Sequence, residues 1–271
     1  MSPNYQVTST EDFLRTHAVF TLEEFAAALR PDATRAARER LKYHAGRGRV
    51  KLLERGLYAS VPAGIDAVRH RADRFLAAAA LRPQGILSHH AALELLGAAH
   101  SAWNVCTVLT DRRRRPLDLD HAEVRFLEHP APLRRKAKQR LGSRHVDYQS
   151  ARLTVTGPER TLVDGFHQPR WVGGLAELVE SASGFGVLDL ELLRAVLDAY
   201  GLKTLFAAVG WFLDRFRETF FVPDRFLSEL RERRPHSPVY LPSKARGGTL
   251  VSEWSLVLPD NVLRLGEPNA G

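Results

Sequence analysis

Residues 20–61 constrain the fold of this chain more than any other stretch, because helix, turn and strand patterns follow one another there without a break. Thr21 and Glu24 have the spacing of a capping box, in which the hydroxyl and the carboxylate each accept a backbone N–H at the start of a helix. Apolar residues then recur on one face, which predicts a short packed helix. Pro31 breaks that pattern and predicts its end. A further helix over residues 9–17 is expected to pack behind this segment.

A second helix is predicted from Thr34, a capping residue, to about His44. On a helical wheel Ala37 and Leu41 lie on one face with His44, which is therefore expected to be a core histidine. The opposite face carries a row of cations, and a solvated helix face is the alternative reading of that row. These cations are Arg35, Arg38 and Lys42.

Residues 49–53 and 57–61 have the composition of two strands joined by a tight turn. Helix, turn, helix and hairpin in this order predict a winged helix-turn-helix, whose second helix is suited to the major groove of DNA. An arginine side chain can bind a guanine edge through two hydrogen bonds, and both lysine and arginine side chains can bind backbone phosphates. We expect base contacts from Arg35 and Arg38, and phosphate contacts from Lys42, Arg47, Arg49, Lys51 and Arg55.

The positive charge is concentrated in two blocks. Residues 35–55 hold eight Lys or Arg against two Glu, and residues 112–144 hold eleven Lys or Arg against four acids. The blocks contribute +13 to a chain whose formal net charge is +8, so all other residues sum to −5. Such an uneven field is typical of a phosphate-binding surface. For Arg112 to Arg115 and Arg134 to Arg140 the simplest interpretation is a pair of solvated turns, and the alternatives are an auxiliary phosphate contact and a docking patch for an acidic partner.

The pattern after the hairpin predicts a larger α+β body. Residues 62–64 form a junction, so the predicted domains are a winged helix-turn-helix over 1–64 and a mixed α+β domain over 65–271. Four helix starts are predicted from capping residues: Asp66, Ser88, Thr156 with Glu159, and Asp189, whose helix is expected to end at Gly201. The expected strands are 104–110, 123–128, 146–149, 153–155, 239–241 and 250–258, and the expected later helices are 189–200, 203–218 and 223–233.

Composition and motifs argue against several classes of function. Cys106 is the single cysteine and lies in an apolar run, so we expect it to be buried and no disulfide to form. His89 and His90 adjoin at a predicted helix start without a third ligand, so no metal is expected. Catalytic motifs such as a phosphate loop, GxSxG, HExxH or a nuclease carboxylate–lysine set are missing, and we expect no enzyme and no cofactor. No apolar run reaches bilayer length, so a soluble, cytoplasmic protein is expected.

Three short phrases occur in an order and spacing that resemble the AbiEi-type antitoxins of abortive-infection toxin–antitoxin systems. The first is Arg-Gly-Leu-Tyr at 55–58, at the end of the predicted winged helix. The second is Ser-His-His-Ala-Ala-Leu-Glu-Leu-Leu-Gly at 88–97. The third is Glu-Arg-Thr-Leu-Val-Asp at 159–164. The resemblance covers roughly residues 18–260.

The resemblance implies a winged helix that binds repeats in its own promoter and a C-terminal domain that counteracts a nucleotidyltransferase-like toxin, without a need for a stable complex. It also implies an antitoxin role for the motif that contains Glu159, Arg160 and Asp164. The residues themselves favour a simpler interpretation, an ion pair between Arg160 and Asp164 one helical turn apart. Two other functions remain open: a winged-helix regulator whose second domain senses a ligand or dimerises, with no toxin, and a nucleic-acid-processing enzyme.

Overall fold

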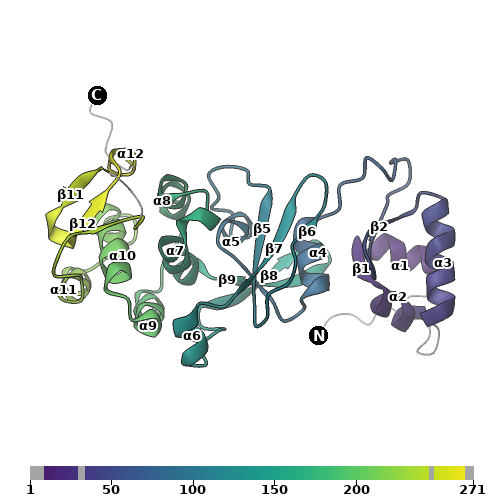
Figure 1. The fold of residues 1–271 in the computed structure, drawn as a ribbon, viewed down its shortest axis with the longest axis horizontal. Coiled ribbons are helices and arrows are strands. Elements are labelled where there is room, and N and C mark those ends of the chain that lie inside the picture. Colours follow the sequence, from purple (N-terminus) through teal and green to yellow (C-terminus); the bar gives the residue numbers. More distant parts are fainter. Residues whose placement is uncertain (1–8, 30–33, 244–246, 266–271) are drawn as a thin grey trace. The chain divides into compact units, whose positions relative to one another are not determined.

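A computed structural model describes residues 9–29, 34–243 and 247–265 of the chain, and these form a mixed α+β protein (Figure 1). The chain divides into two compact units. The first contains Met1–Gly85, Asn104–Leu127 and Asp147–Leu153, and the second contains Ile86–Trp103, Glu128–Val146 and Thr154–Gly271. The predicted segment 1–64 lies inside the first unit. Its independence as a domain stays a prediction.

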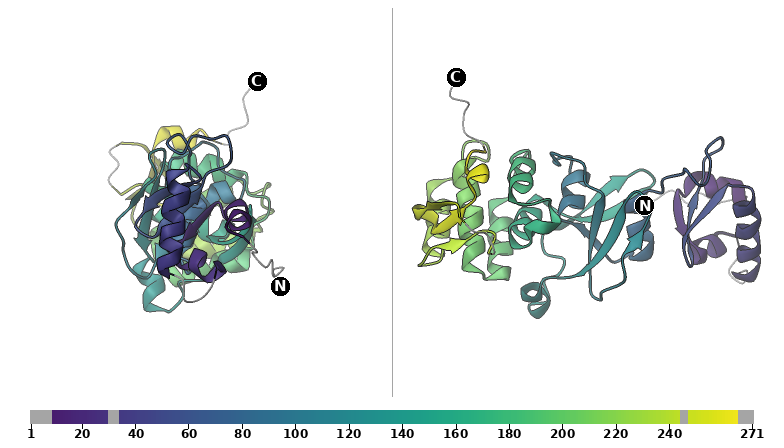
Figure 2. Two further views of the ribbon diagram at one scale, coloured as in Figure 1. Left: turned by 90° about the vertical axis from the view of Figure 1, so that its right-hand side faces the viewer. Right: turned by 45° about the horizontal axis from the view of Figure 1, so that its top comes forward.

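The N-terminal segment has the element order of a winged helix, as the sequence predicts. Its strands form an antiparallel sheet in the order β1-β3-β2, with Val19 opposite Ala59 and Val50 opposite Ser60. The first strand, β1, was not predicted. Figures 1 and 2 show these elements in purple and blue. They are α1 (Thr10–Thr16), β1 (Val19–Thr21), α2 (Leu22–Leu29), α3 (Thr34–Gly46), β2 (Val50–Glu54) and β3 (Leu57–Ser60).

Local chemistry explains where the first helices begin and how they pack. The Thr21 N–H donates to Glu24 Oε2 at 2.7 Å, and the Glu24 N–H donates to Thr21 Oγ1 at 3.1 Å, so the predicted capping box is confirmed. The ring of Phe13 meets those of Phe20 and Phe25 edge-on, at centroid distances of 5.1 Å in both cases. All three aromatic residues are buried, and they anchor the small core of the winged helix. The predicted break at Pro31 lies outside the described residues.

The helix predicted to start at Asp66 begins seven residues later. Asp73 is the N-cap of α4 (Arg74–Leu81), because its Oδ1 accepts the N–H groups of Phe75 and Leu76 at 2.8 and 2.9 Å. Asp66 instead accepts the Val68 N–H at 2.8 Å and stabilises a turn. The prediction of the cap at Asp66 was therefore wrong, because either aspartate can cap locally and only packing selects one.

A six-stranded mixed sheet has the order β6-β7-β5-β4-β9-β8. Four of its strands were predicted, and the short strands β4 and β6 were not. Ser88 ends strand β4, so the prediction that it caps a helix was wrong; the next helix starts after His89 without a side-chain cap. The strands are β4 (Ile86–Ser88), β5 (Val105–Thr110), β6 (Leu117–Asp118), β7 (Glu123–Glu128), β8 (Ser143–Tyr148) and β9 (Ala151–Thr156). Cys106 on β5 is fully buried, as predicted.

Helices surround the core of the second unit. Asp189 caps α9, its Oδ1 accepting the Leu192 N–H at 2.9 Å, and Gly201 ends that helix with a φ of 65°, both as predicted. Helix α8 was missed, although its buried residues recur at helical spacing. The helices are α5 (His90–Leu95), α6 (Ala131–Arg135), α7 (Pro158–His167), α8 (Leu175–Ser183), α9 (Leu190–Tyr200), α10 (Lys203–Arg215), α11 (Asp224–Glu232) and α12 (Asp260–Leu263).

The C-terminal part forms a small three-stranded sheet in the order β10-β12-β11. The single strand expected over 250–258 is two strands separated by a 3-10 turn, Ser252–Trp254, which places Trp254 in the core. The strands are β10 (Val239–Tyr240), β11 (Thr249–Val251) and β12 (Leu256–Leu258). Within the described parts of the chain, every helix is too short or too polar to cross a bilayer.

Candidate functional site

Helix α3 separates a packed face from a cationic face. Ala37 and Leu41 are 0% and 1% exposed and pack into the core of the winged helix. Arg35, Arg38 and Lys42 are exposed, as predicted. Lys42 pairs with Glu39 at 2.9 Å across one helical turn in the open solvent, which is a weak interaction that a phosphate can replace. The arrangement presents a row of cations on the helix that, in a winged helix, enters the major groove.

His44 is half-buried, so the prediction of a core histidine was wrong. It lies near the end of α3, where its ring meets Tyr43 edge-on at 5.4 Å. Burial, and then the neighbouring charge of Arg49, lower the pKa of His44 below its ordinary value. The imidazole is therefore mostly neutral at pH 7, and it adds little to the cationic face.

The hairpin β2–β3 carries some, though not all, of the predicted phosphate-binding cations. Arg47, Arg49 and Arg55 are exposed, and the guanidinium of Arg47 lies 4.5 Å above the Tyr43 ring. Lys51 is different, because its side chain is only 22% exposed. Its Nζ donates to the His70 carbonyl at 3.1 Å and lies 3.2 Å from Asp120 Oδ2. Lys51 is engaged within the protein, so its expected role as a phosphate contact is not supported by its position.

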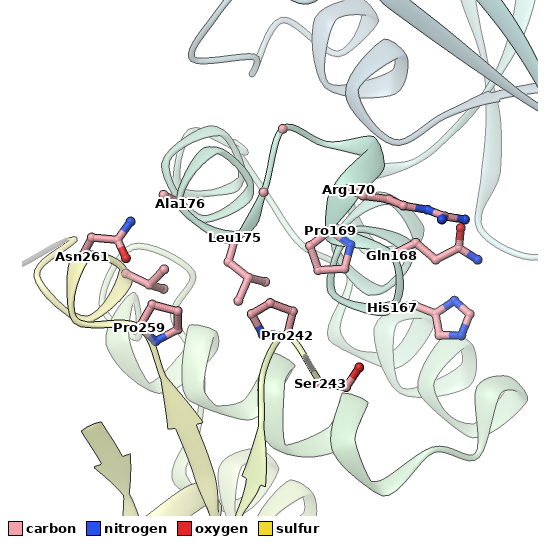
Figure 3. A pocket seen from close by; sticks show the side chains of 13 residues that line it. His167, Gln168, Pro169, Arg170, Leu175, Ala176, Pro242, Ser243, Pro259 and Asn261 are labelled. Carbon is pink, nitrogen blue, oxygen red and sulfur yellow. The ribbon is translucent and has the colours of Figure 1, made fainter. Parts of the chain in front are cut away.

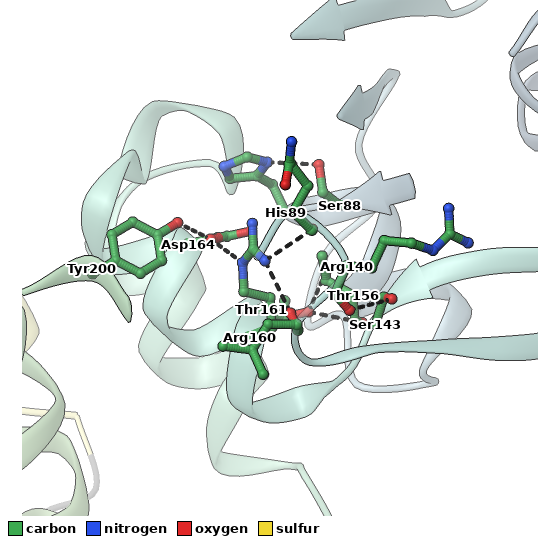
Figure 4. A network of polar contacts seen from close by, with 11 residues as sticks. Ser88, His89, Arg140, Ser143, Thr156, Arg160, Thr161, Asp164 and Tyr200 are labelled. Carbon is green, nitrogen blue, oxygen red and sulfur yellow. Dashed lines mark hydrogen bonds and ion pairs between the residues drawn. The ribbon is translucent and has the colours of Figure 1, made fainter. Parts of the chain in front are cut away.

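The predicted pair Arg160–Asp164 is present on α7 and is completely buried (Figure 4). Arg160 Nε donates to Asp164 Oδ1 at 2.7 Å, and both side chains are 1% exposed. Arg160 Nη1 also donates to the Leu141 carbonyl at 3.0 Å, and the Tyr200 hydroxyl donates to Asp164 Oδ1. Burial opposes the charge of Arg160, but the Asp164 carboxylate prevails and raises the pKa of Arg160. Burial and the same carboxylate raise the pKa of Tyr200 well above its usual range.

Two polar atoms of this network have no hydrogen-bond partner among the described residues, namely Asp164 Oδ2 and Arg160 Nη2. A buried ionised group that lacks one of its bonds is costly, so the pair depends on its remaining contacts. The cluster links α7 to α9 through Tyr200 and to the segment before β8 through Leu141. Its geometry is that of a structural ion pair, the simpler of the two interpretations that the sequence allows.

Glu159 does not complete a capping box with Thr156, so that prediction was wrong. Thr156 ends strand β9, Gly157 is the N-cap residue of α7, and the Thr156 hydroxyl lies 2.7 Å from the Thr161 hydroxyl. Glu159 Oε1 instead accepts the backbone N–H of Asp189 at 2.8 Å. The carboxylate thus fastens the start of α7 to the cap of α9. Sequence spacing alone could not distinguish this contact from a local cap.

His89, which no predicted site includes, has an unusual backbone between β4 and α5. Its φ of 54° and ψ of −127° fall in a region that residues other than glycine rarely adopt, at a cost of roughly 1–3 kcal/mol. The ring is 2% exposed, and its Nδ1 lies 2.9 Å from the Ser88 hydroxyl. Burial lowers the pKa of His89 to about 4, against an opposing effect of Asp164. Because strand β4 was not predicted, the strand-to-helix turn at His89 could not be anticipated from the sequence.

Neighbouring His90 is also buried, and carboxylates flank it. Its Nδ1 lies 3.0 Å from Glu94 Oε1, and its Nε2 lies 3.4 Å from Glu177 Oε1. Glu177 is itself held by the hydroxyl of Ser101 at 2.8 Å. In the described ranges, no group of three or more His, Cys, Asp or Glu side chains could hold a metal ion.

The second unit also contains an open cleft of about 850 Å³ (Figure 3). The end of α7, the start of α8 and the C-terminal segments line it. His167, Gln168 and Arg170 lie on one side of the cleft, and Asn261 lies on the other. Burial lowers the pKa of His167, with the Asp164 charge acting in the opposite direction. Pro169, Leu175, Pro242, Pro259 and Val262 provide apolar walls.

The structure is a mixed α+β fold whose N-terminal elements follow the order of a winged helix. The chain is similar in structure to the crystal structure of the RV2827C protein from Mycobacterium tuberculosis, with a TM-score of 0.62 and 18% sequence identity. The similarity covers 93% of this chain and 90% of that protein, so it extends over both units and shows a shared fold. No protein-family model and no curated protein match the sequence.

Proposed function

We propose that this chain is a cytoplasmic transcriptional regulator that binds double-stranded promoter DNA through its winged helix. The observation that carries the proposal is the arrangement of α3. One face, with Ala37 and Leu41, is fully packed, and the opposite face exposes Arg35, Arg38 and Lys42 without an equal number of acids. Recognition helices of winged and other helix-turn-helix proteins use such a face to reach base edges. Arg47, Arg49 and Arg55 are exposed, which supports a role for them in binding the flanking phosphates.

The first experiment is a titration of duplex DNA from the chain's own upstream region at several salt concentrations. The Arg38→Ala variant is expected to bind that duplex more weakly and to lose preference for it over a scrambled duplex, because arginine reads guanine through two bonds. Arg15→Ala on α1 removes the same charge from an exposed position outside the proposed interface and is the matched control. Equal affinities of the wild type and the Arg38→Ala variant for both duplexes would overturn the proposal.

We further propose that the protein is the antitoxin of a nucleotidyltransferase-like toxin and represses its own operon by excluding polymerase. The support is the resemblance of residues 55–58, 88–97 and 159–164 to AbiEi-type antitoxins. Residues 88–97 and 159–164 lie in the second unit, where the motif residues Glu159, Arg160 and Asp164 are buried. Buried motif residues support a role in maintaining the α+β body, whose surface would then act against the toxin. No cofactor is required for either activity.

The antitoxin proposal is tested by co-expression. The product of a neighbouring nucleotidyltransferase-like gene is expected to arrest growth, and the full-length chain is expected to restore it. The full-length Arg35→Ala/Arg38→Ala variant should still restore growth while it fails to repress the promoter. Absence of such a gene, or continued arrest despite a folded protein, would count against the antitoxin proposal and leave DNA regulation in place.

The cleft supports a second candidate function, a regulator that senses a small ligand through its second unit. The volume of the cleft, about 850 Å³, falls in the range of small-molecule sites, and the walls of the cleft combine apolar residues with a few polar groups. Thermal shift screening with anionic and aromatic metabolites tests this function. A hit that changes DNA affinity in the wild type and not in an Arg170→Ala variant would favour it over the antitoxin.

A further inference from the structure

The loop between β5 and β6 contains the first part of the second basic block. Four consecutive arginines, 112–115, follow strand β5, which ends at Thr110. Arg112, Arg113 and Arg115 are exposed, whereas Arg114 is half-buried. The Thr110 hydroxyl donates to the Arg112 carbonyl at 2.8 Å and so fixes the first turn of the loop. The loop belongs to the same compact unit as the winged helix.

Arg114 attaches this loop to the hairpin of the winged helix. Its Nη2 forms an ion pair with Glu54, the last residue of β2, and the two side chains are 23% and 26% exposed. The same guanidinium lies 5.2 Å from the centre of the Phe126 ring on β7. A half-buried, hydrogen-bonded arginine with an aromatic neighbour holds its loop far better than a solvated surface pair would.

A second attachment joins the same strand of the hairpin to the connection between β6 and β7. Lys51 lies on β2 and forms an ion pair with Asp120, which follows β6. It also donates to the carbonyls of Val68 and His70, at 3.5 and 3.1 Å. Two side chains of β2, three residues apart, therefore contact the 111–120 region. The hairpin and this region are joined at two points.

The paired residues place exposed cations near each other. Arg55 directly follows Glu54, and Arg115 directly follows Arg114, so each exposed arginine is one residue, about 3.8 Å along the backbone, from an ion-paired neighbour. Glu54 is neutralised by Arg114, and Asp120 by Lys51. The exposed arginines at 55, 112, 113 and 115 then outnumber the exposed acids Asp111 and Asp118 of this region. The guanidinium group is the side-chain group best suited to bind phosphate.

We propose that Arg112 and Arg115 extend the DNA-binding surface of the hairpin, and that they bind backbone phosphates of the duplex beside the base pairs contacted by α3. The inference rests on the proposed DNA-binding function and adds a contact outside the winged helix. Duplex DNA carries one negative charge per roughly 1.7 Å of its axis, so adjacent cationic elements can contact successive phosphates without reading sequence. Lys51 and Arg114 act as positioning residues, since they hold the loop in place and do not themselves contact DNA.

The test is the salt dependence of binding to duplex DNA from the chain's own upstream region, measured with the full-length protein. The Arg112→Ala/Arg115→Ala variant is expected to lower the slope of log K against log salt by up to about 1.8, which is 0.9 for each of two phosphate contacts. Its affinity near 0.1 M salt should fall by an order of magnitude, with the preference over a scrambled duplex retained. The Arg112→Lys/Arg115→Lys variant should recover most of the slope.

A matched control separates local from general electrostatics. The Arg135→Ala/Arg140→Ala variant removes the same charge from exposed positions of the second unit and should leave the slope near that of the wild type. Equal losses in both variants would overturn the proposal, because only net charge would then matter. An unchanged slope in the loop variant would also overturn it, while loss of binding in Arg38→Ala would show that the DNA-binding function itself stands.

Two further outcomes identify a different function or partner. If the wild-type protein binds no duplex at any salt concentration, the proposed function fails and this inference fails with it. If the loop variant loses affinity only for single-stranded RNA of the same length, or only for an acidic protein, the loop has another partner and the inference is wrong. Circular dichroism and thermal unfolding of each variant confirm that the comparison is made between folded proteins.

Discussion

Arg160 and Asp164 form an ion pair at 2.7 Å in which both side chains are 1% exposed. Removing one partner would leave an uncompensated charge in the core. We expect Asp164→Ala to lower the free energy of unfolding by about 3–5 kcal/mol, and Arg160→Met with Asp164→Leu to lose much less, because no charge remains buried. Chemical denaturation measures both values.

The control for this prediction is an exposed pair. Glu253 is 54% exposed and lies 2.7 Å from Arg231, so Glu253→Ala is expected to cost well under about 1 kcal/mol. A similar, small loss for Asp164→Ala would contradict the buried position of the pair. Antitoxic activity retained in a destabilised but folded Asp164→Ala variant would show that the motif acts through stability.

The lowered pKa of His89 predicts that the protein loses stability in mild acid. Its pKa is about 4 in the folded protein and 6.5 in the unfolded chain, so the unfolded state binds a proton more readily between these values. The stability contributed by neutral His89 is therefore complete above about pH 6.5 and is lost as the pH falls towards 4. The loss should reach about 2 kcal/mol at pH 5.

The comparison is between wild type and His89→Gln, in urea at pH 7 and pH 5. Because glutamine does not titrate, its variant should lose less stability between the two pH values. His167 also has a lowered pKa and contributes to both proteins, so the difference between them isolates His89. An equal loss of stability in the wild type and the His89→Gln variant between pH 7 and pH 5 would show that protonation of His89 does not cause the loss.

Gly210 lies against the indole ring of Trp254. A Cβ at position 210 would be 2.1 Å from Cζ3 and 2.4 Å from Cη2 of that ring, and Trp254 is only 1% exposed. Gly210→Ala is therefore expected to destabilise the protein by about 1–3 kcal/mol or more, through displacement of a rigid ring. Gly186→Ala is the control, because a Cβ there would have no heavy atom within 4 Å. Thermal unfolding that shows equal effects at both positions would contradict the packing.

Substitution of Lys51 should lower the stability of the protein, whereas substitution of Arg49 should weaken DNA binding. Lys51→Ala removes bonds to Asp120 and to two backbone carbonyls, and we expect a loss of about 1 kcal/mol in stability. Arg49 is exposed, so Arg49→Ala should leave stability unchanged and reduce the salt slope of DNA binding by about 0.9. Unfolding curves and DNA titrations of both variants check this. The reverse result would restore Lys51 as a phosphate contact.

Local chemistry determined much of the fold in advance. The capping box of Thr21 and Glu24, the cap at Asp189 and the end of α9 at Gly201 each depend on residues within four positions of one another, and all were predicted correctly. The cationic face of α3 follows from helical periodicity in the same way. The ion pair of Arg160 and Asp164 was also predictable, because residues four apart on a helix face each other.

Only the tertiary structure decided features that depend on distant residues. Glu159 has the spacing of a cap partner, yet it bonds to Asp189, thirty positions away. Lys51 has the sequence context of a phosphate contact, yet Asp120 and the 68–70 backbone bind it. The burial of Arg160 and Asp164 has the same origin, since helix spacing fixes their distance while only packing excludes water from them. The sequence therefore determined which groups can interact locally, and the packed fold selected which of those interactions form.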